Sequence, residues 1–92
     1  MSNHNLKSNP EYFKASWAGV KPFEIRRNDR NFQLNDEVVL LEWDPFGKDH
    51  PSIKGLGAFT GREICGFIDY ITDFEQKPGY VVFAIRETRR SE

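Results

Sequence analysis

The chain has one cysteine, one methionine and two histidines among its 92 residues. A single cysteine, Cys65, excludes an intramolecular disulfide framework. Its position within an apolar segment predicts a small core residue rather than a nucleophile. His4 and His50 are isolated, with no cysteine or carboxylate cluster at metal-ligand spacing. The sequence therefore predicts neither a metal site nor a cofactor.

Long apolar runs and an excess of one charge are also missing. No segment approaches the roughly 20 apolar residues that span a bilayer, and the polar residues 1–7 contain no signal-peptide core. We therefore expect no membrane contact and a cytoplasmic location. Thirteen Lys and Arg against fourteen Asp and Glu give a net charge of −1 at pH 7. Binding to a polyanion would therefore depend on a local basic patch.

The composition fits one folded domain over residues 1–92, because 38% of the residues are hydrophobic and 29% are charged. Residues 44–61 contain Pro45, Pro51 and four glycines, which predicts a long loop. Part of this loop should fold back on the domain, since it carries the apolar residues Phe46, Ile53, Leu56 and Phe59. The polar residues 87–92 predict a frayed tail.

A short helix is predicted over residues 10–18. Asn9 is a candidate N-cap, and a proline occupies the first helical position. Gly19 is suited to the left-handed position that ends a helix. Phe13 and Trp17 are four residues apart, so they share one helical face and should anchor the helix to a core.

After the helix the period of the pattern changes to two. Phe23 and Ile25 fall on one face of a predicted strand, and Glu24 and Arg26 fall on the other. Residues 28–31 form a turn signal. Asn35-Asp36 forms a second one, at which Asn tolerates a positive φ.

Three further strands are predicted at residues 37–43, 63–71 and 80–86, because each has a continuous apolar centre. Gly66 within the second of them indicates a bulge or a bend. Periodicity gives little support for another strand at residues 4–7. The pattern predicts an α+β fold in which a short N-terminal helix packs on a small β barrel.

The functional surface should centre on residues 19–30. Arg26 offers a planar guanidinium suited to phosphate or carboxylate, and Lys21 offers a point charge. Burial would also make Lys21 a candidate base. From residue types alone, an ordinary structural ion pair between Glu24 and Arg26 explains the pattern equally well.

Gly19-x-Lys21-x-x-Glu24-x-Arg26 matches the G-x-K-x-x-E-x-R signature of ASCH domains, a branch of the PUA-like superfamily. The chain most closely resembles a small bacterial and phage family of unassigned function within that superfamily. Further matching blocks span almost the whole chain: Pro10-Glu11-Tyr12-Phe13, Asn28-Asp29-Arg30, Glu42-Trp43-Asp44-Pro45, Thr60-Gly61-Arg62 and Gly79-Tyr80-Val81-Val82. The resemblance implies a barrel of about five or six strands, with a cleft near the signature similar to RNA or nucleotide sites.

The leading hypothesis from this resemblance is a module that binds a nucleotide or a short single-stranded RNA. Lys21, Arg26 and Arg30 would contact phosphate, and Glu24 would accept hydrogen bonds from a base edge or orient Arg26. The remaining candidate ligand-binding residues are Asn28 and two aromatic residues that would stack on a base, Tyr12 and Trp43.

Two alternatives remain open. Some small ASCH proteins resemble this chain and hydrolyse the amide of an acylated cytidine with a Lys, a Thr and a Glu. Lys21 and Glu24 would be the catalytic residues here, although Glu24 occupies the position of that threonine. The other alternative is a protein-interaction module, in which residues 44–61 bind a protein partner through apolar anchors such as Phe46, Leu56 and Phe59.

Overall fold

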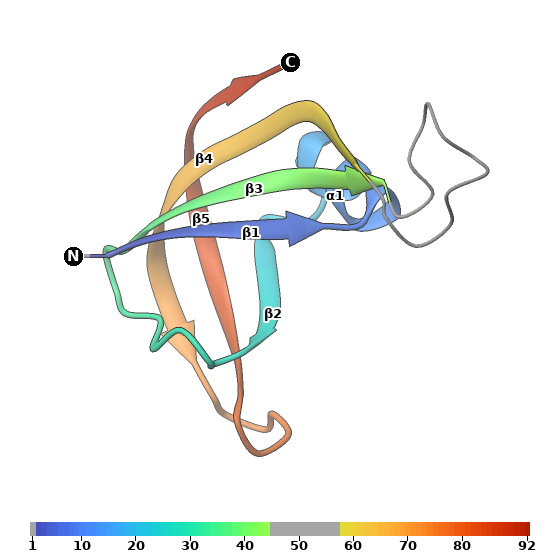
Figure 1. The fold of residues 1–92 in the computed structure, drawn as a ribbon. Helices are drawn as coiled ribbons and strands as arrows, with labels where there is room; N and C mark the ends of the chain where they lie inside the picture. Colours follow the sequence, from blue (N-terminus) through green and yellow to red (C-terminus); the bar gives the residue numbers. More distant parts are fainter. Residues whose placement is uncertain (1, 45–57) are drawn as a thin grey trace.

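The computed structural model describes residues 2–44 and 58–92. In chain order its elements are β1 (Asn3–Ser8), α1 (Pro10–Trp17), β2 (Phe23–Arg27), β3 (Glu37–Asp44), β4 (Ala58–Thr72) and β5 (Tyr80–Ser91). The five strands form one sheet in the order β1-β3-β4-β5-β2, which curls into a half-barrel (Figure 1). The predicted α+β class is therefore confirmed at the level of mostly strands with one short helix.

The sheet leaves β1 and β2 as its two edge strands. β1 pairs with β3 in parallel, whereas the β3–β4, β4–β5 and β5–β2 pairs are antiparallel. Figure 1 shows the sheet curling until β1 and β2 lie opposite each other at a steep angle. A seam without strand pairing therefore runs between these two edges.

The helix α1 has the predicted core face and the predicted glycine at its C-terminal end. Asn9 occupies the N-cap position, but its side chain makes no capping hydrogen bond. Gly19 follows the last helical turn with φ +81°, and the amide of Val20 donates to Ala15 O at 3.1 Å. This 6→1 bond is the closing bond of a Schellman motif, which glycine permits at no steric cost. Phe13 is fully buried, and its ring centroid lies 5.8 Å from that of Trp17.

The long strand β4 bends where the sequence places a glycine. The β4–β5 register shifts between Cys65 and Gly66 and again between Ile68 and Tyr70, which confirms the bulge predicted at Gly66. Bulges raise the local twist and let one long strand follow a curved sheet. Cys65 is 1% exposed, and burial raises the pKa of its thiol, so its prediction as a core residue is confirmed.

The core fills the concave side of the half-barrel with inward residues from β1, β3, β4, β5 and α1 and from the loop that follows β2. Its members are Leu6, Phe13, Phe32, Val38, Leu40, Ile64, Ile68, Val81 and Phe83. In β3 the alternate residues Val38, Leu40 and Glu42 are buried, while the residues between them are only half-buried. The prediction that β3 is covered on both faces is therefore only partly confirmed.

Three predicted boundaries differ from the structure. β5 continues to Ser91 by pairing with β4, so residues 87–91 are strand rather than a frayed tail. Strands also occupy both ends of the predicted loop at 44–61, since β3 includes Asp44 and β4 begins at Ala58. The predictions for Phe46, Ile53 and Leu56 concern residues that lie outside the described part of the chain.

The strand β1 precedes the helix and is held by a buried polar network. His4 Nε2 lies 2.8 Å from Asp36 Oδ2, and Asp36 also accepts from the amides of Ser2 and Gln33. Asp36 is 2% exposed and follows Asn35, whose φ of 73° confirms the predicted positive φ. Burial raises the pKa of the Asp36 carboxyl, but the hydrogen bonds outweigh burial and hold the pKa below its ordinary value.

Gly66 sits where no side chain fits. A Cβ at this position would lie 2.5 Å from Arg86 O and 2.7 Å from Ile85 Cγ2. Because a backbone oxygen has little room to move, Gly66→Ala should destabilise the fold by about 1–3 kcal/mol. Urea unfolding monitored by circular dichroism measures this change. A variant within about 0.5 kcal/mol of the wild type would contradict the close approach.

The lowered pKa of Asp36 predicts a defined loss of stability in acid. A carboxyl with a depressed folded pKa stabilises the fold above its unfolded pKa, and this contribution is lost as the pH falls through the folded pKa. The wild type should therefore lose more stability between about pH 5 and pH 2 than Asp36→Asn does. At neutral pH the variant should be less stable by about 1–3 kcal/mol. Urea unfolding at several pH values tests both statements, and parallel pH profiles would refute the role of Asp36.

Candidate functional site at the seam of the sheet

A single arginine joins the two unpaired edges of the sheet. Arg26 on β2 donates from Nη2 to Lys7 O on β1 at 3.0 Å. Lys7 Nζ in turn lies 4.2 Å from the ring centroid of Trp43 on β3. The seam is therefore bridged by a charged side chain rather than by backbone pairing.

Glu24 organises the cations at this seam. It is 3% exposed, and its Oε1 accepts from Arg26 Nε at 2.9 Å while its Oε2 accepts from Lys21 Nζ at 2.5 Å. Lys21 Nζ also donates to Phe23 O at 2.9 Å. The carboxylate thus fixes both cations in a geometry that is set before any ligand arrives.

Strand β2 shows the predicted alternation, but its charged face points inward and its apolar face points outward. Glu24 points into the half-barrel, whereas Phe23 and Ile25 remain 40% and 55% exposed. Burying a charged group costs several kcal/mol before its partners compensate, and burying an apolar side chain stabilises by about 1.5–3 kcal/mol. Hydrophobic burial alone would favour the opposite orientation of this strand.

A pocket of about 450 Å³ opens beside this cluster, between the end of β1 and β2. We call it the carboxylate pocket. Its lining residues are Lys7, Ser8, Asn9, Tyr12, Lys21, Phe23, Glu24, Ile25 and Arg26. Tyr12 comes from the first turn of α1 and is 53% exposed. The pocket therefore combines two fixed cations, a carboxylate and an accessible aromatic ring.

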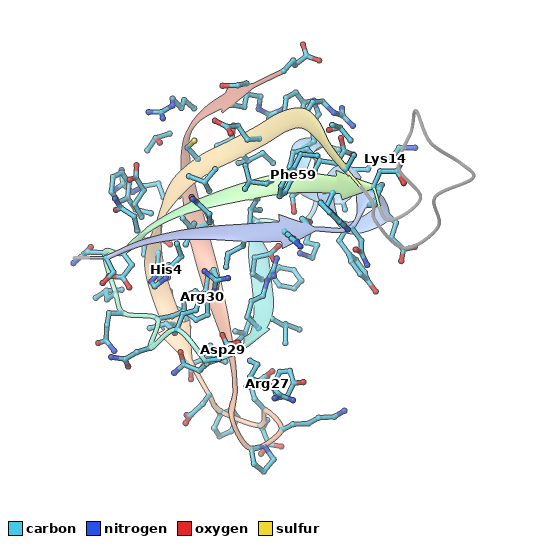
Figure 2. All side chains as sticks on the ribbon, viewed as in Figure 1. His4, Lys14, Arg27, Asp29, Arg30 and Phe59 are labelled. Atoms are coloured by element: carbon cyan, nitrogen blue, oxygen red, sulfur yellow. The ribbon has the colours of Figure 1, made fainter. Side chains whose placement is uncertain are left out.

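A second depression of about 710 Å³ continues along the seam and shares Lys7 and Arg26 with the first. We call it the basic groove. Its charged lining residues are Lys7, Arg26, Arg27, Asp29 and Arg30. Figure 2 shows Arg27, Asp29 and Arg30 together near the end of β2, far from Lys14 on α1. The basic groove therefore has four basic side chains and one acidic side chain.

The structure brings together most of the predicted site residues. Lys21, Glu24, Arg26 and Tyr12 line the carboxylate pocket, and Arg30 lines the basic groove. Asn28 has a structural contact instead, because its Oδ1 accepts from the amide of Phe32 at 2.8 Å and caps the turn that follows β2. Trp43 packs edge-on against Phe59, with ring centroids 4.9 Å apart, as well as against Lys7.

One buried ion cluster was not among the predicted residues. Glu42 is 5% exposed and accepts from Thr60 Oγ1 at 2.6 Å and from Arg62 Nε at 3.0 Å. Burial raises the pKa of the Glu42 carboxyl, but the Arg62 and Thr60 hydrogen bonds together lower it below its ordinary value. The Arg62 guanidinium also lies 5.1 Å from the Trp17 ring, so the cluster fixes α1 to β3 and β4. A carboxylate at an inward position of an apolar strand is the sequence signal for it.

Within residues 2–44 and 58–92, no three His, Cys, Asp or Glu side chains are grouped so that they could hold a metal ion. In the same part of the chain, no helix has the length and apolar character required to cross a membrane.

Comparison with known proteins places the chain in a family. The family model described as "Domain of unknown function (DUF3850)" matches residues 3–85. An uncharacterized 12.9 kDa protein in the GpA 3′ region of Escherichia phage P2 is 33% identical over 70 residues, which are 76% of this chain and 54% of that protein. The chain therefore spans about half the length of this curated relative. The matched range covers all of β1 to β4 and the start of β5, and the chain belongs to the DUF3850 family.

Proposed function

We propose that this chain binds a nucleotide or a short single-stranded RNA in the carboxylate pocket, and that its half-barrel is an ASCH-type variant of the PUA-like fold. The observation that carries the proposal is the buried Glu24, which holds Lys21 and Arg26 at the wall of an open pocket.

The energetics of the cluster favour a functional role. Replacing a buried ion pair with apolar side chains is often neutral or stabilising, so such a pair is weak support for a purely structural role. The apolar side chains of Phe23 and Ile25 are available on the same strand but face outward. This arrangement gives up apolar burial in order to fix two cations in a pocket, and such departures from the usual inside–outside pattern are expected at functional sites.

The donors that remain on the two cations suit a phosphate. The hydrogen bonds of Arg26 to Glu24 and Lys7 O use Nε and Nη2, which leaves Nη1 directed to other partners. Lys21 and Arg26 carry two positive charges against the single charge of Glu24, so the cluster retains one positive charge. Hydrogen bonds from ionised donors to phosphate oxygens are short and strong, so Arg26 Nη1 and the Lys21 ammonium can together hold one phosphate group.

The adjoining basic groove extends this positive surface. It adds Arg27 and Arg30, opposed by Asp29. Because Lys7 and Arg26 belong to both depressions, a ligand with a phosphate at Arg26 can place a base on one side and a further phosphate on the other. That geometry fits a short nucleotide chain at least as well as a mononucleotide.

Tyr12 is the better placed of the two predicted stacking residues. Its ring lines the carboxylate pocket and is half exposed. Trp43 is held between Lys7 and Phe59. A base that stacks on Tyr12 would have its phosphate within the reach of Lys21 and Arg26, which are residues of the same pocket.

Neither alternative function is favoured by a particular contact. The amidohydrolase hypothesis needs a hydroxyl where this chain has Glu24, and both oxygens of that carboxylate accept from cations. The protein-interaction hypothesis rests on residues 44–61, most of which lie outside the described residues. Incubation with acetylcytidine tests the first, and release of cytidine would support it.

Removing the Lys21 charge should weaken binding without unfolding the domain. We expect Lys21→Ala to reduce affinity for a short single-stranded RNA about tenfold, because one charge-assisted phosphate contact is lost. Lys14→Ala removes the same charge from an exposed position on α1 and should bind as the wild type does. Amide chemical-shift titration with RNA, matching DNA and free nucleotides measures these affinities and ranks the ligands.

The salt dependence provides a second readout of the same titration. The logarithm of the binding constant should fall with the logarithm of salt with a slope of about −0.7 per phosphate contact. Lys21→Ala should reduce the magnitude of this slope by about 0.7, which is the value for one phosphate contact. Equal weakening by Lys21→Ala and Lys14→Ala, or no shift with any ligand, would refute the proposed site.

Stacking on Tyr12 should be measurable independently of charge. We expect Tyr12→Ala to weaken RNA binding by about 1–3 kcal/mol, because base stacking on an aromatic ring contributes about that much. Tyr70→Ala is the matched control, since Tyr70 is also exposed and lies outside both depressions. Unlike the lysine variant, Tyr12→Ala should leave the salt slope unchanged. If Tyr12→Ala binds RNA with the wild-type affinity, Tyr12 does not stack on a base.

A further inference from the structure

The outward face of strands β2, β5 and β4 carries an apolar surface that extends beyond the proposed nucleotide site. Phe23 and Ile25 belong to this surface and also line the carboxylate pocket. Phe23 is level with Ala84 on β5, and Ala84 is level with Tyr70 on β4. One step along the strands, Ile25 is level with Val82, and Val82 is level with Thr72. Residues level across antiparallel strands point to the same face. We call Phe23, Ile25, Tyr70, Val82 and Ala84 the outer face.

The large side chains of the outer face are unusually exposed to solvent. Phe23, Ile25 and Tyr70 keep 40%, 55% and 62% of their surfaces exposed. Single exposed apolar residues are ordinary, but a contiguous group on the outer side of a sheet marks a surface that binds another molecule. The opposite face of the same strands holds Phe83 and Ile68, which are fully buried, so the sheet already has its core.

The charges that flank the outer face are divided between its two sides. Arg27 is the next residue after Ile25 on the same face of β2, and it also lines the basic groove. Its guanidinium lies 5.8 Å from the ring centroid of Tyr80. On the β4 side, Asp69 precedes Tyr70, and Asp73 follows Thr72. All three charged residues are exposed. Arg27 and Asp73 flank the same end of the face, because Ile25, Val82 and Thr72 are level across the three strands.

We infer that the outer face binds a second copy of this chain. A two-fold axis that runs along β5 places β2 of one copy over β4 of the other at the same level. Phe23 then faces Tyr70 of the second copy, and Arg27 faces Asp73 of the second copy. Each contact occurs twice, as a closed two-fold interface requires.

The charge pattern selects this axis over the other two-fold axis in the plane of the sheet. An axis perpendicular to the strands would place β2 over β2 and bring Arg27 over the apolar Phe23 of the second copy. The axis along β5 pairs opposite charges and apolar with aromatic side chains. Electrostatic complementarity of this kind fixes the register of an interface.

Charge reversal across the interface tests the inference. Analytical ultracentrifugation from micromolar to near-millimolar protein should show a monomer–dimer equilibrium for the wild type. Arg27→Asp and Asp73→Arg should each weaken dimerisation about tenfold or more, because each creates two like-charge contacts. An equimolar mixture of the two variants restores both contacts in a heterodimer and should recover the wild-type association.

Tyr70→Glu isolates the apolar part of the interface. It should abolish dimerisation while circular dichroism shows a folded domain, because Tyr70 is exposed in the monomer. Lys14→Glu is a control on α1 and should leave dimerisation unchanged. A wild type that stays monomeric throughout, a dimer that resists Tyr70→Glu, or a mixture that fails to recover association would overturn the inference.

One variant, Tyr70→Glu, tests the dimerisation proposal separately from the nucleotide-binding proposal. Tyr70 lies outside both depressions at the seam, so Tyr70→Glu should bind RNA as the wild type does even when dimerisation is lost.

Discussion

The structure depends on a sheet that curls without closing. Five strands bring β1 and β2 opposite each other, but the two edges cross steeply and form no ladder. Unpaired edge groups have to find other partners. One is Lys7 O, which accepts from the Arg26 guanidinium. Holding that guanidinium in place requires Glu24, and Glu24 in turn fixes Lys21. The seam, the buried carboxylate and the positive pocket are therefore consequences of one geometric constraint.

The sequence predicts the elements whose local chemistry is sufficient to define them. Pro10, the Phe13 and Trp17 pair and Gly19 specify α1 almost to the residue, and the apolar centres specify the middles of β3, β4 and β5. Gly66 marks the bend correctly because only a residue without a Cβ fits against Arg86 O. For α1 and the strand centres the cause lies within a few residues of the signal, whereas Gly66 is a local signal for a close approach by the distant Arg86.

The parts that pattern reasoning does not predict depend on residues far away in the chain. In β1 the inward positions are His4, Leu6 and Ser8, so the apolar period is absent, and His4 is stable inside because Asp36 lies 2.8 Å away. The end of β5 is polar because both of its faces are exposed there, and it is ordered by pairing with the unusually long β4. Likewise, alternation in β2 identifies two faces, but only the seam determines that the charged face is the inner one.

The inverted polarity of β2 also links the two surfaces of the molecule. Successive side chains of a strand point to opposite faces, so turning Glu24 and Arg26 toward the seam necessarily turns Phe23 and Ile25 outward. The exposed apolar face is therefore a direct result of building a cation pocket on an edge strand. A partner that covers Phe23 and Ile25 would recover the apolar burial that the monomer forgoes, at about 25 cal/mol per Å² of apolar surface removed from water. The proposed binding at the seam and the inferred association through the outer face would thus both follow from the same strand orientation.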